Sequence, residues 1–273
     1  MPKYHVVSFY QIEKIIEHER LSRDVTRYAT KNSLLGTFFS TPQGINTTMS
    51  GDREALEGLI RLLDSKFNLS VFNPKWSASE DRPFKRLRVR LKPTLLPLEG
   101  EFDPILKRGK HLEATEWNTL ISDPDTIVID VRNDYETDIG TFKNSIIPNM
   151  KDFTEFPRFI DKGTVKNKKK KIAMFCTGGI RCEIASSFMI NRGFEEVYQL
   201  KGGVLNYLEK VDDDKNLWEG ECFVFDERVS LDKSLKQGKY VQCFGCRRPL
   251  SEDDLQSEYY QKGVSCSYCY EVS

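Results

Sequence analysis

The 273-residue sequence has no net charge, no long hydrophobic run and no internal repeat. Its 41 basic residues are balanced by 41 acidic ones, so no positive field over the whole molecule points to nucleic acid. No apolar stretch approaches the roughly 20 residues that a transmembrane helix needs. The opening residues, MPKYHVVSFYQIEK, lack the pattern of a signal peptide. We therefore expect a protein that is not associated with a membrane.

Cysteine occurs in an odd number, seven, and four of the seven form two close pairs near the C-terminus. Close pairs in a chain of this length favour metal binding or reactive thiols over a disulfide framework. This usage is typical of a reducing compartment, and we expect the protein to be cytoplasmic. No obligate protein partner is evident.

The charges are unevenly distributed along the chain. Residues 1–100 contain 16 basic and 11 acidic residues, a surplus of five positive charges, whereas the remainder contains 25 basic and 30 acidic residues. A partner that carries phosphates is therefore expected to meet the N-terminal part.

Residues 1–95 alternate short strands with helices and predict a first domain. Apolar residues recur at helical spacing over residues 11–29, and Asp52 is a suitable N-cap for a second helix. The predicted strands are residues 4–10, 33–40, 44–51 and 85–93. The order strand-helix-strand-strand-helix-strand is that of a ferredoxin-like (acylphosphatase-like) α+β sandwich.

A proline-rich, aperiodic segment predicts a linker over residues 96–112, followed by a second domain at residues 113–215. Short apolar strands separated by helical stretches predict an α/β domain with a doubly wound parallel sheet, covered by helices on both faces. Residues 216–273 are irregular, and we expect a small cysteine-rich module there. The predicted strands of the second domain are residues 126–131, 170–175 and 195–200.

The stretch FCTGGIRCE, residues 175–183, is the strongest candidate for chemistry. Cys176 ends a predicted strand and a helix is expected over residues 183–193, so backbone N–H groups and the helix dipole converge on the loop. Glycines let the backbone curl, and an arginine adds positive charge. These factors lower the pKa of a thiol. We predict a Cys176 thiolate in an anion-binding loop made by Thr177, Gly178, Gly179, Ile180 and Arg181.

Three motifs, DVRNDYETDIGTF, FCTGGIRC and VYQLKGGVLNYLE, resemble the rhodanese domain. Over the whole chain GINTTMSG, PFKRLRVRLK, LWEGECFVFDERV and CRRPLSEDD occur with them in an order similar to that of the rhodanese-containing tRNA uridine hydroxylases. This resemblance implies oxygen-dependent conversion of the wobble uridine to 5-hydroxyuridine, with the anticodon stem-loop of tRNA as partner. Molecular oxygen is the implied co-substrate, and no flavin or nucleotide cofactor is evident.

The resemblance implies that Cys176 is the catalytic group. Its thiolate could add to carbon 6 of uracil and give an enolate that oxygen attacks at carbon 5. Backbone amides of the loop and Arg181 could stabilise the developing oxyanion. Cys182 is interpreted either as a resolving thiol or as a packing residue. An ion-pair cluster that supports the loop is expected from Asp130, Arg132 and Glu136.

Two other functions fit the same residues. A loop of six residues from Cys176 to Arg181 resembles that of sulfurtransferases, which would carry a persulfide on Cys176. A non-catalytic RNA-binding or redox-sensing module is the third interpretation. Such a module would still bind tRNA after Cys176→Ala and would leave the RNA chemically unchanged.

The predicted strand KRLRVRLK carries cations on one side and apolar residues on the other. Such a row can follow a phosphate backbone, although charges also protect an edge strand against aggregation. The lysine run at residues 166–171 is a second, weaker candidate. We expect RNA contact at Arg86, Arg88, Arg90 and Lys92.

The pairs CFGC and CSYC near the C-terminus are separated by 19 residues. This spacing is typical of a structural zinc site with four thiolate ligands, and reduced thiols or a redox pair are the alternative. The expected ligands are Cys243, Cys246, Cys266 and Cys269. Cys222 is expected in the core.

Overall fold

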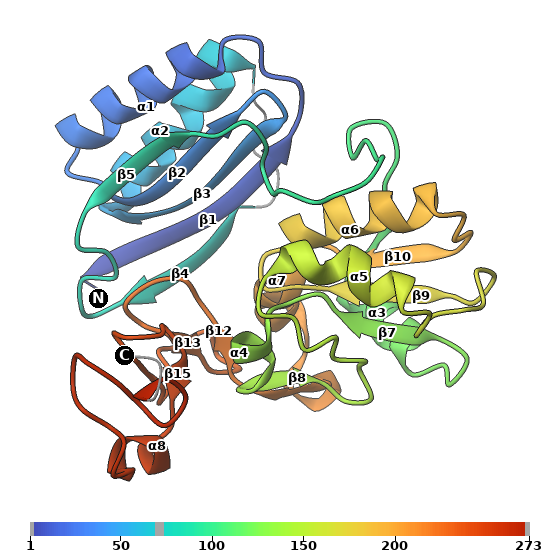
Figure 1. Ribbon diagram of the computed structural model, residues 1–273. Coiled ribbons are helices and arrows are strands. Elements are labelled where there is room, and N and C mark those ends of the chain that lie inside the picture. Colours follow the sequence, from blue (N-terminus) through green and yellow to red (C-terminus); the bar gives the residue numbers. More distant parts are fainter. Residues whose placement is uncertain (1–2, 69–73, 271–273) are drawn as a thin grey trace.

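The computed structural model describes residues 3–68 and 74–270, which form an N-terminal domain, a second domain and a smaller C-terminal part (Figure 1). Among these residues, no helix is both long and apolar enough to cross a membrane.

The N-terminal domain is a five-stranded sheet with two helices on one face (Figure 1). Asp52 caps the second helix as predicted, because its carboxylate accepts the N–H of Glu54 at 2.9 Å. Val7 and Phe9 of the first strand are buried with residues of both helices, so the even-numbered residues of that strand face away from them. In the spatial order β4-β1-β3-β2-β5, the elements are β1 (Tyr4–Ile12), β2 (Leu35–Thr41), β3 (Gly44–Gly51), β4 (Lys75–Ser79) and β5 (Leu87–Leu91), with α1 (His18–Lys31) and α2 (Arg53–Phe67).

The acylphosphatase-like α+β fold is confirmed, and the strand predicted at residues 85–93 is present as β5, but it is not the strand that completes the fold. β4 closes the unit by pairing antiparallel with β1, whereas β5 is an added strand that pairs parallel with β2 at the opposite edge. β4 was missed because KWSAS is short and Trp76 is its only bulky apolar residue. Its pairing sets Lys75 opposite Ser8, on the face of the sheet that the helices leave open.

The second domain has a four-stranded sheet in the order β6-β10-β9-β7, with every pairing parallel. The predicted parallel sheet is confirmed, although the short edge strand β6 was not anticipated. The elements are β6 (Lys110–Leu112), α3 (Ala114–Ile121), β7 (Ile127–Asp130), α4 (Asp134–Thr137), β8 (Gly140–Phe142), α5 (Phe156–Asp161), β9 (Ile172–Phe175), α6 (Ile180–Asn191), β10 (Val197–Leu200) and α7 (Gly203–Lys210), with 3₁₀ turns at Phe153–Glu155 and Asp213–Lys215.

Two hydrophobic clusters cover the two faces of this sheet. Ile172 and Met174 of β9 pack with α5 and α6, whereas Ala173 and Phe175 pack with α3 and α7. Because both faces are covered, β9 is buried over its whole length. This explains the uninterrupted apolar run that made it recognisable in the sequence.

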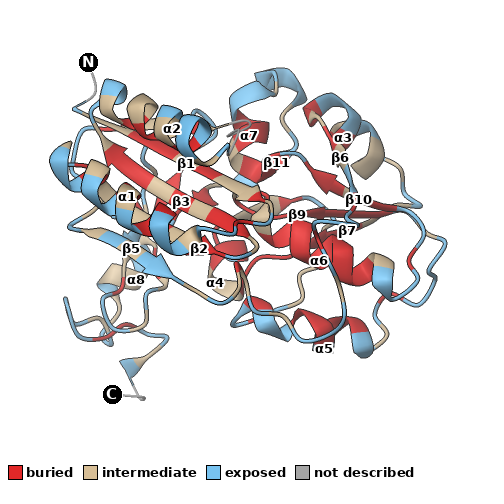
Figure 2. Ribbon diagram, turned by 90° about the horizontal axis from the view of Figure 1, so that it is seen from above, coloured by how far each residue is buried: buried red, intermediate tan, exposed pale blue. Residues whose placement is uncertain are grey.

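Residues 96–112 were predicted as a linker; residues 110–112 form β6, and residues 96–109 lie against α6. The Phe102 ring meets the Phe188 ring with centroids 6.4 Å apart, and the Gly109 N–H donates to the Ser186 hydroxyl at 2.9 Å. Figure 2 accordingly shows most of α6 in the colour of buried residues, whereas β5 is largely exposed.

The C-terminal part consists of short strand pairs. β11 (Trp218–Gly220) pairs with β8 of the second domain, β12 (Cys222–Phe223) pairs with β13 (Ser230–Leu231), and β14 (Val241–Gln242) pairs with β15 (Pro249–Leu250) before α8 (Glu252–Gln256). Cys222 is fully buried, as expected, in the cluster on the α3 and α7 side of the sheet.

Candidate active site

The loop that follows β9 reaches α6 within four residues. α6 begins at Ile180, three residues before the predicted start, so Arg181 and Cys182 lie in its first turn. Gly179 has a φ of +99°, and a Cβ there would lie 2.9 Å from the hydroxyl of Tyr10. The backbone can therefore make this tight entry into the helix only with glycine at that position.

The same loop is held from the other side by α7. The N–H groups of Val204 and Leu205 donate to the carbonyl oxygens of Cys176 and Thr177 at 3.0 and 3.1 Å. Gly203 permits this approach, because a Cβ there would lie 2.4 Å from the Cys176 carbonyl oxygen. The conformation of the loop is therefore determined by hydrogen bonds at a helix N-terminus and by the lack of a side chain at two glycines.

The Cys176 thiol is surrounded by donors. The Gly179 N–H donates to its Sγ at 3.1 Å. Burial by itself raises the pKa of this thiol, but a hydrogen bond from the Cys182 thiol, the charge of Arg181 and backbone N–H groups outweigh burial and lower the pKa to about 6. Burial raises the pKa of Cys182 well above its usual value, so Cys182 remains a neutral donor. Cys176 is thus mostly a thiolate at pH 7.

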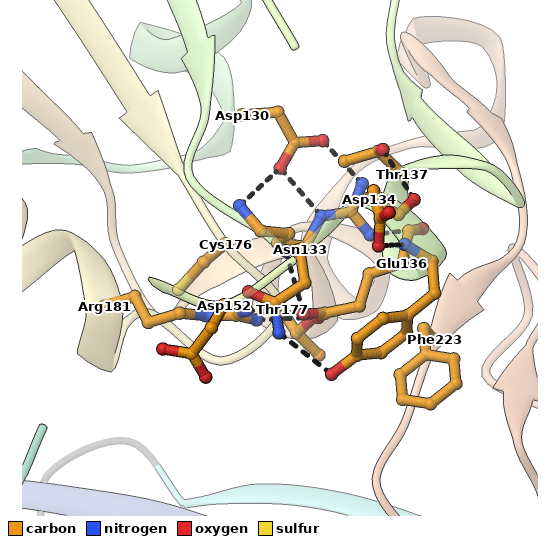
Figure 3. Close-up of polar contacts among 12 residues, drawn as sticks. Asp130, Asn133, Asp134, Glu136, Thr137, Asp152, Cys176, Thr177, Arg181 and Phe223 are labelled. Carbon is orange, nitrogen blue, oxygen red and sulfur yellow. Dashed lines mark hydrogen bonds and ion pairs between the residues drawn. The ribbon is translucent and has the colours of Figure 1, made fainter. Parts of the chain in front are cut away.

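Beneath the loop, Glu136 of α4 binds Arg181 through two parallel hydrogen bonds of 2.5 and 2.7 Å, and it also accepts the Thr177 hydroxyl at 3.1 Å (Figure 3). The Glu136 side chain is fully buried. Burial raises the pKa of Glu136, but Arg181 outweighs burial and holds it below its usual value. The guanidinium of Arg181 is therefore compensated by this carboxylate and holds the loop in place.

A second buried ion pair lies behind the first. The Arg132 guanidinium donates to both oxygens of Asp130 at 2.9 and 2.6 Å and to the Glu136 carbonyl oxygen at 3.3 Å. The Thr141 hydroxyl donates to Asp130 at 2.8 Å. The three predicted support residues therefore meet under the loop, where Asp130 and Arg132 anchor α4 and Glu136 contacts the loop itself.

Cys176 lines a cavity of about 490 Å³ whose walls come from all three parts of the chain. The open face of the N-terminal sheet contributes Ser8, Asn46 and Thr48, and the loop contributes Cys176. The C-terminal part contributes Phe225, whose side chain is 60% exposed. The thiolate therefore borders a partly open cavity that combines aromatic and polar walls, as binding sites for small molecules do.

Two domain families match this chain. Residues 4–95 match the UPF0176 acylphosphatase-like domain, and residues 113–210 match the rhodanese-like domain. The chain joins a UPF0176 acylphosphatase-like domain to a rhodanese-like domain. This composition is consistent with the UPF0176 family, and the rhodanese domain supports a sulfurtransferase-like or related function.

Solved structures resemble the two domains separately. A rhodanese-like domain from Anabaena sp. is 18% identical, covers 40% of this chain and 78% of its own, and has a TM-score of 0.33. A rhodanese-related protein from Thermoplasma volcanium is 25% identical, with 37% and 92% covered and a TM-score of 0.31. An acylphosphatase from Coxiella burnetii is 17% identical, with 32% and 92% covered and a TM-score of 0.24.

The predicted basic row lies on the same open sheet face as the wall of the Cys176 cavity. Thr37 of β2 is paired with Thr48 of β3 on one side and with Arg88 of β5 on the other, so their side chains share a face. Thr37 lines both the Cys176 cavity and an adjoining cleft of about 650 Å³, which Arg86 and Arg88 also line. Arg86, Arg88 and Arg90 are exposed, whereas Lys92 is half-buried over the Phe39 ring.

The second lysine run lies elsewhere. Residues 166–171 precede β9, at the end of the rhodanese sheet opposite Cys176. Lys170 and Lys171 pair with Asp125 and Asp123 at 3.4 and 3.0 Å. This run therefore belongs to a turn beneath the sheet and does not adjoin the cavity.

The four C-terminal cysteines converge, with their Sγ atoms within 4.8 Å of one another. The sulfur of Cys266 lies 3.7 Å from that of Cys246 and 3.8 Å from that of Cys269, and the Cys243 to Cys269 distance is 4.0 Å. Tetrahedral zinc with bonds of about 2.3 Å separates its sulfurs by about 3.8 Å. The cluster therefore fits a structural metal ion with four protein ligands.

Several residues of the cavity were not predicted from the sequence. Lys75 lies on the unpredicted strand β4, and a single lysine between Pro74 and Trp76 matches no motif. Asp226 and Arg228, by contrast, are part of the motif LWEGECFVFDERV; they form a buried ion pair of 2.6 Å, and Arg228 also donates to Ser77 at 2.7 Å. That motif could have been assigned to the wall of the site from its paired charges.

Proposed function

We propose that this protein is a cytoplasmic enzyme that hydroxylates the wobble uridine of tRNA at carbon 5 with molecular oxygen. The observation that carries the proposal is the shared sheet face, on which the cations of β5 adjoin the cavity of Cys176. A phosphate backbone that follows β5 could present one splayed base of an anticodon loop to the thiolate. The motif order of the tRNA uridine hydroxylases supports the choice of substrate.

The proposed chemistry begins with the Cys176 thiolate. Its sulfur adds to carbon 6 of uracil, and the electron pair of the C5–C6 double bond moves to oxygen 4 as an enolate. Oxygen then adds at carbon 5 and takes a proton to give a hydroperoxide. Loss of the carbon 5 proton and of Cys176 from carbon 6 restores the ring.

One oxygen atom must leave as water, which requires two electrons and two protons. The thiols of Cys176 and Cys182, which are hydrogen-bonded to each other, can supply both by forming a disulfide. Uridine, oxygen and two thiols then give 5-hydroxyuridine, water and one disulfide, and a cellular dithiol must reduce that disulfide before the next turnover. In this proposal Cys182 takes the resolving role, which is one of the two interpretations that the sequence left open for it.

The decisive experiment uses tRNA from a strain that lacks the protein, complemented with wild type or Cys176→Ala and grown under ¹⁸O₂. Nucleosides are analysed by mass spectrometry at a resolution that separates an added oxygen from a sulfur substitution. Labelled oxygen in uridine with wild type alone is the expected result. Labelled uridine that persists with Cys176→Ala would refute the mechanism.

Sulfur transfer is the second candidate, and the match to the rhodanese-like domain favours it. In that case Cys176 attacks a sulfur donor and carries a persulfide. Intact mass spectrometry of the protein after incubation with thiosulfate would show an added sulfur on wild type but not on Cys176→Ala. Sulfur in tRNA instead of labelled oxygen would select this function over hydroxylation.

A further inference from the structure

Three cationic side chains line the Cys176 cavity, and two of them are neutralised. Arg181 is bound by Glu136 through two hydrogen bonds, and Arg228 is bound in the same way by Asp226 at 2.8 and 2.6 Å. Neither guanidinium has a free charge to offer a ligand. The third cation, Lys75, differs from both.

Lys75 is 7% exposed, and its ammonium group makes no ion pair or hydrogen bond within residues 3–68 and 74–270. Its contact is the Tyr10 ring, with Nζ 4.9 Å from the centroid. A buried ammonium without a counter-charge is costly, because it loses its hydration without gaining a partner. A lysine in this position therefore suits a site in which negative charge is present or develops.

We propose that Lys75 is the cation that the N-terminal domain supplies to the Cys176 site, where it stabilises the thiolate and then the anionic oxygen formed when the thiolate adds to an unsaturated carbonyl compound. The second step rests on the proposed function, whereas the first does not. In that step the electron pair displaced by the new S–C bond resides on the carbonyl oxygen, and the Lys75 ammonium donates a hydrogen bond to it.

The electrostatics of the pocket agree with this role. Burial lowers the pKa of Lys75 to about 8, and the charges of Cys176, Glu183 and Glu209 oppose that shift. Lys75 is therefore still mainly protonated at pH 7, but it is close to losing its proton. The other titratable groups around it are Tyr10, whose hydroxyl donates to Glu183 at 2.7 Å, and those that line the two cavities it borders. These are Tyr135 and Asp152 in the Cys176 cavity, and Arg108, His111, Glu113 and Lys201 in the cavity behind it.

The site is consequently composite. The rhodanese-like domain provides the nucleophile and the donors that ionise it, and β4 of the acylphosphatase-like domain provides the uncompensated charge opposite. An isolated rhodanese-like domain would lack that charge.

The test measures alkylation of Cys176 by iodoacetamide against pH in the full-length protein, with the modified peptide quantified by mass spectrometry. Wild type should react with a midpoint near pH 6. Lys75→Met should raise the midpoint by about one pH unit, which makes alkylation about fivefold slower at pH 6. Lys75→Arg should behave like wild type. Lys31→Met, an exposed lysine on α1 behind the sheet, is the matched control.

An unchanged midpoint in Lys75→Met and in Lys75→Gln, with circular dichroism showing that both are folded, would overturn the proposal. A lower thermal stability with an unchanged midpoint would overturn it as well, because it would mean a purely structural role. If the midpoint rises in Lys75→Met while wild type adds no oxygen to tRNA, the charge role stands and the proposed function fails.

Discussion

Replacing Glu136 by glutamine should destabilise the protein more than any change in its exposed ion pairs. The Glu136 carboxylate accepts bonds from Arg181 Nη1 and Nη2, from the Thr177 hydroxyl and from the Asn133 N–H. Glutamine has nearly the same shape but no charge, and its amide nitrogen cannot accept. Arg181, whose side chain is 9% exposed, would remain buried without a counter-charge. Breaking a buried pair in this way costs about 3–5 kcal/mol.

The assay is urea unfolding followed by circular dichroism, applied to wild type, Glu136→Gln, Arg181→Met and the double variant. The double variant should be more stable than Glu136→Gln alone, because it no longer buries an unpaired charge. The control is Glu99→Gln, which changes an exposed glutamate in the segment before β6 and should change the free energy of unfolding by less than about 0.5 kcal/mol. Additive effects of the two single changes would refute the account of the pair.

The difference in free energy of unfolding between wild type and Glu136→Gln should depend on pH, and the pKa of Glu136 gives the sign of that dependence. The pKa of Glu136 lies below its usual value of 4.5 in the folded protein, so the carboxylate contributes stability above about pH 4.5, and this contribution is lost as the pH falls. The gap between wild type and Glu136→Gln should therefore narrow in acid. A gap that stays constant below pH 4 would contradict the pKa direction.

Three further outcomes follow from the site and its surroundings. Cys182→Ala removes the thiol donor of Cys176, so the pH midpoint of Cys176 alkylation should move above 6; a midpoint that stays at 6 would assign the thiolate to the other donors. Arg88→Gln should weaken tRNA binding and reduce the salt slope by about 1, whereas Lys31→Gln should do neither; equal slopes in filter binding at several salt concentrations would remove β5 from the interface. We expect wild type to contain one zinc ion per chain by atomic absorption and Cys243→Ser to contain less; wild-type protein without zinc would favour reduced thiols.

The sequence predicts the elements whose pattern is unambiguous. β9 is a continuous apolar run because both sheet faces are covered, and α2 has a recognisable cap at Asp52. β4 has neither signal, and its place in the sheet depends on pairing with β1, which lies about 70 residues away. β4 is therefore a strand because it pairs with β1, and its local sequence does not predict it.

In the candidate site, too, the features that depend on local sequence were predicted, and those that depend on tertiary contacts were not. Cys176 and its loop are local in sequence, so their spacing alone indicates a thiolate. The role of Arg181 is not local, because its partner Glu136 comes from α4 and compensates the charge that was expected to stabilise an oxyanion. Lys75 enters the site only through the packing of one domain on another, which no local pattern reports.

The two faces of the N-terminal sheet have different roles: one packs against the helices, and the other lines the Cys176 cavity. Val7 and Phe9 of β1 pack with the helices, whereas Val6 and Ser8 face the cavity. A change at Ser8, Asn46 or Thr48 can alter what enters the cavity while the packing beneath α1 and α2 stays intact. Recognition can therefore diverge in this lineage at little risk to folding, since the residues that select a ligand are not those that build the core.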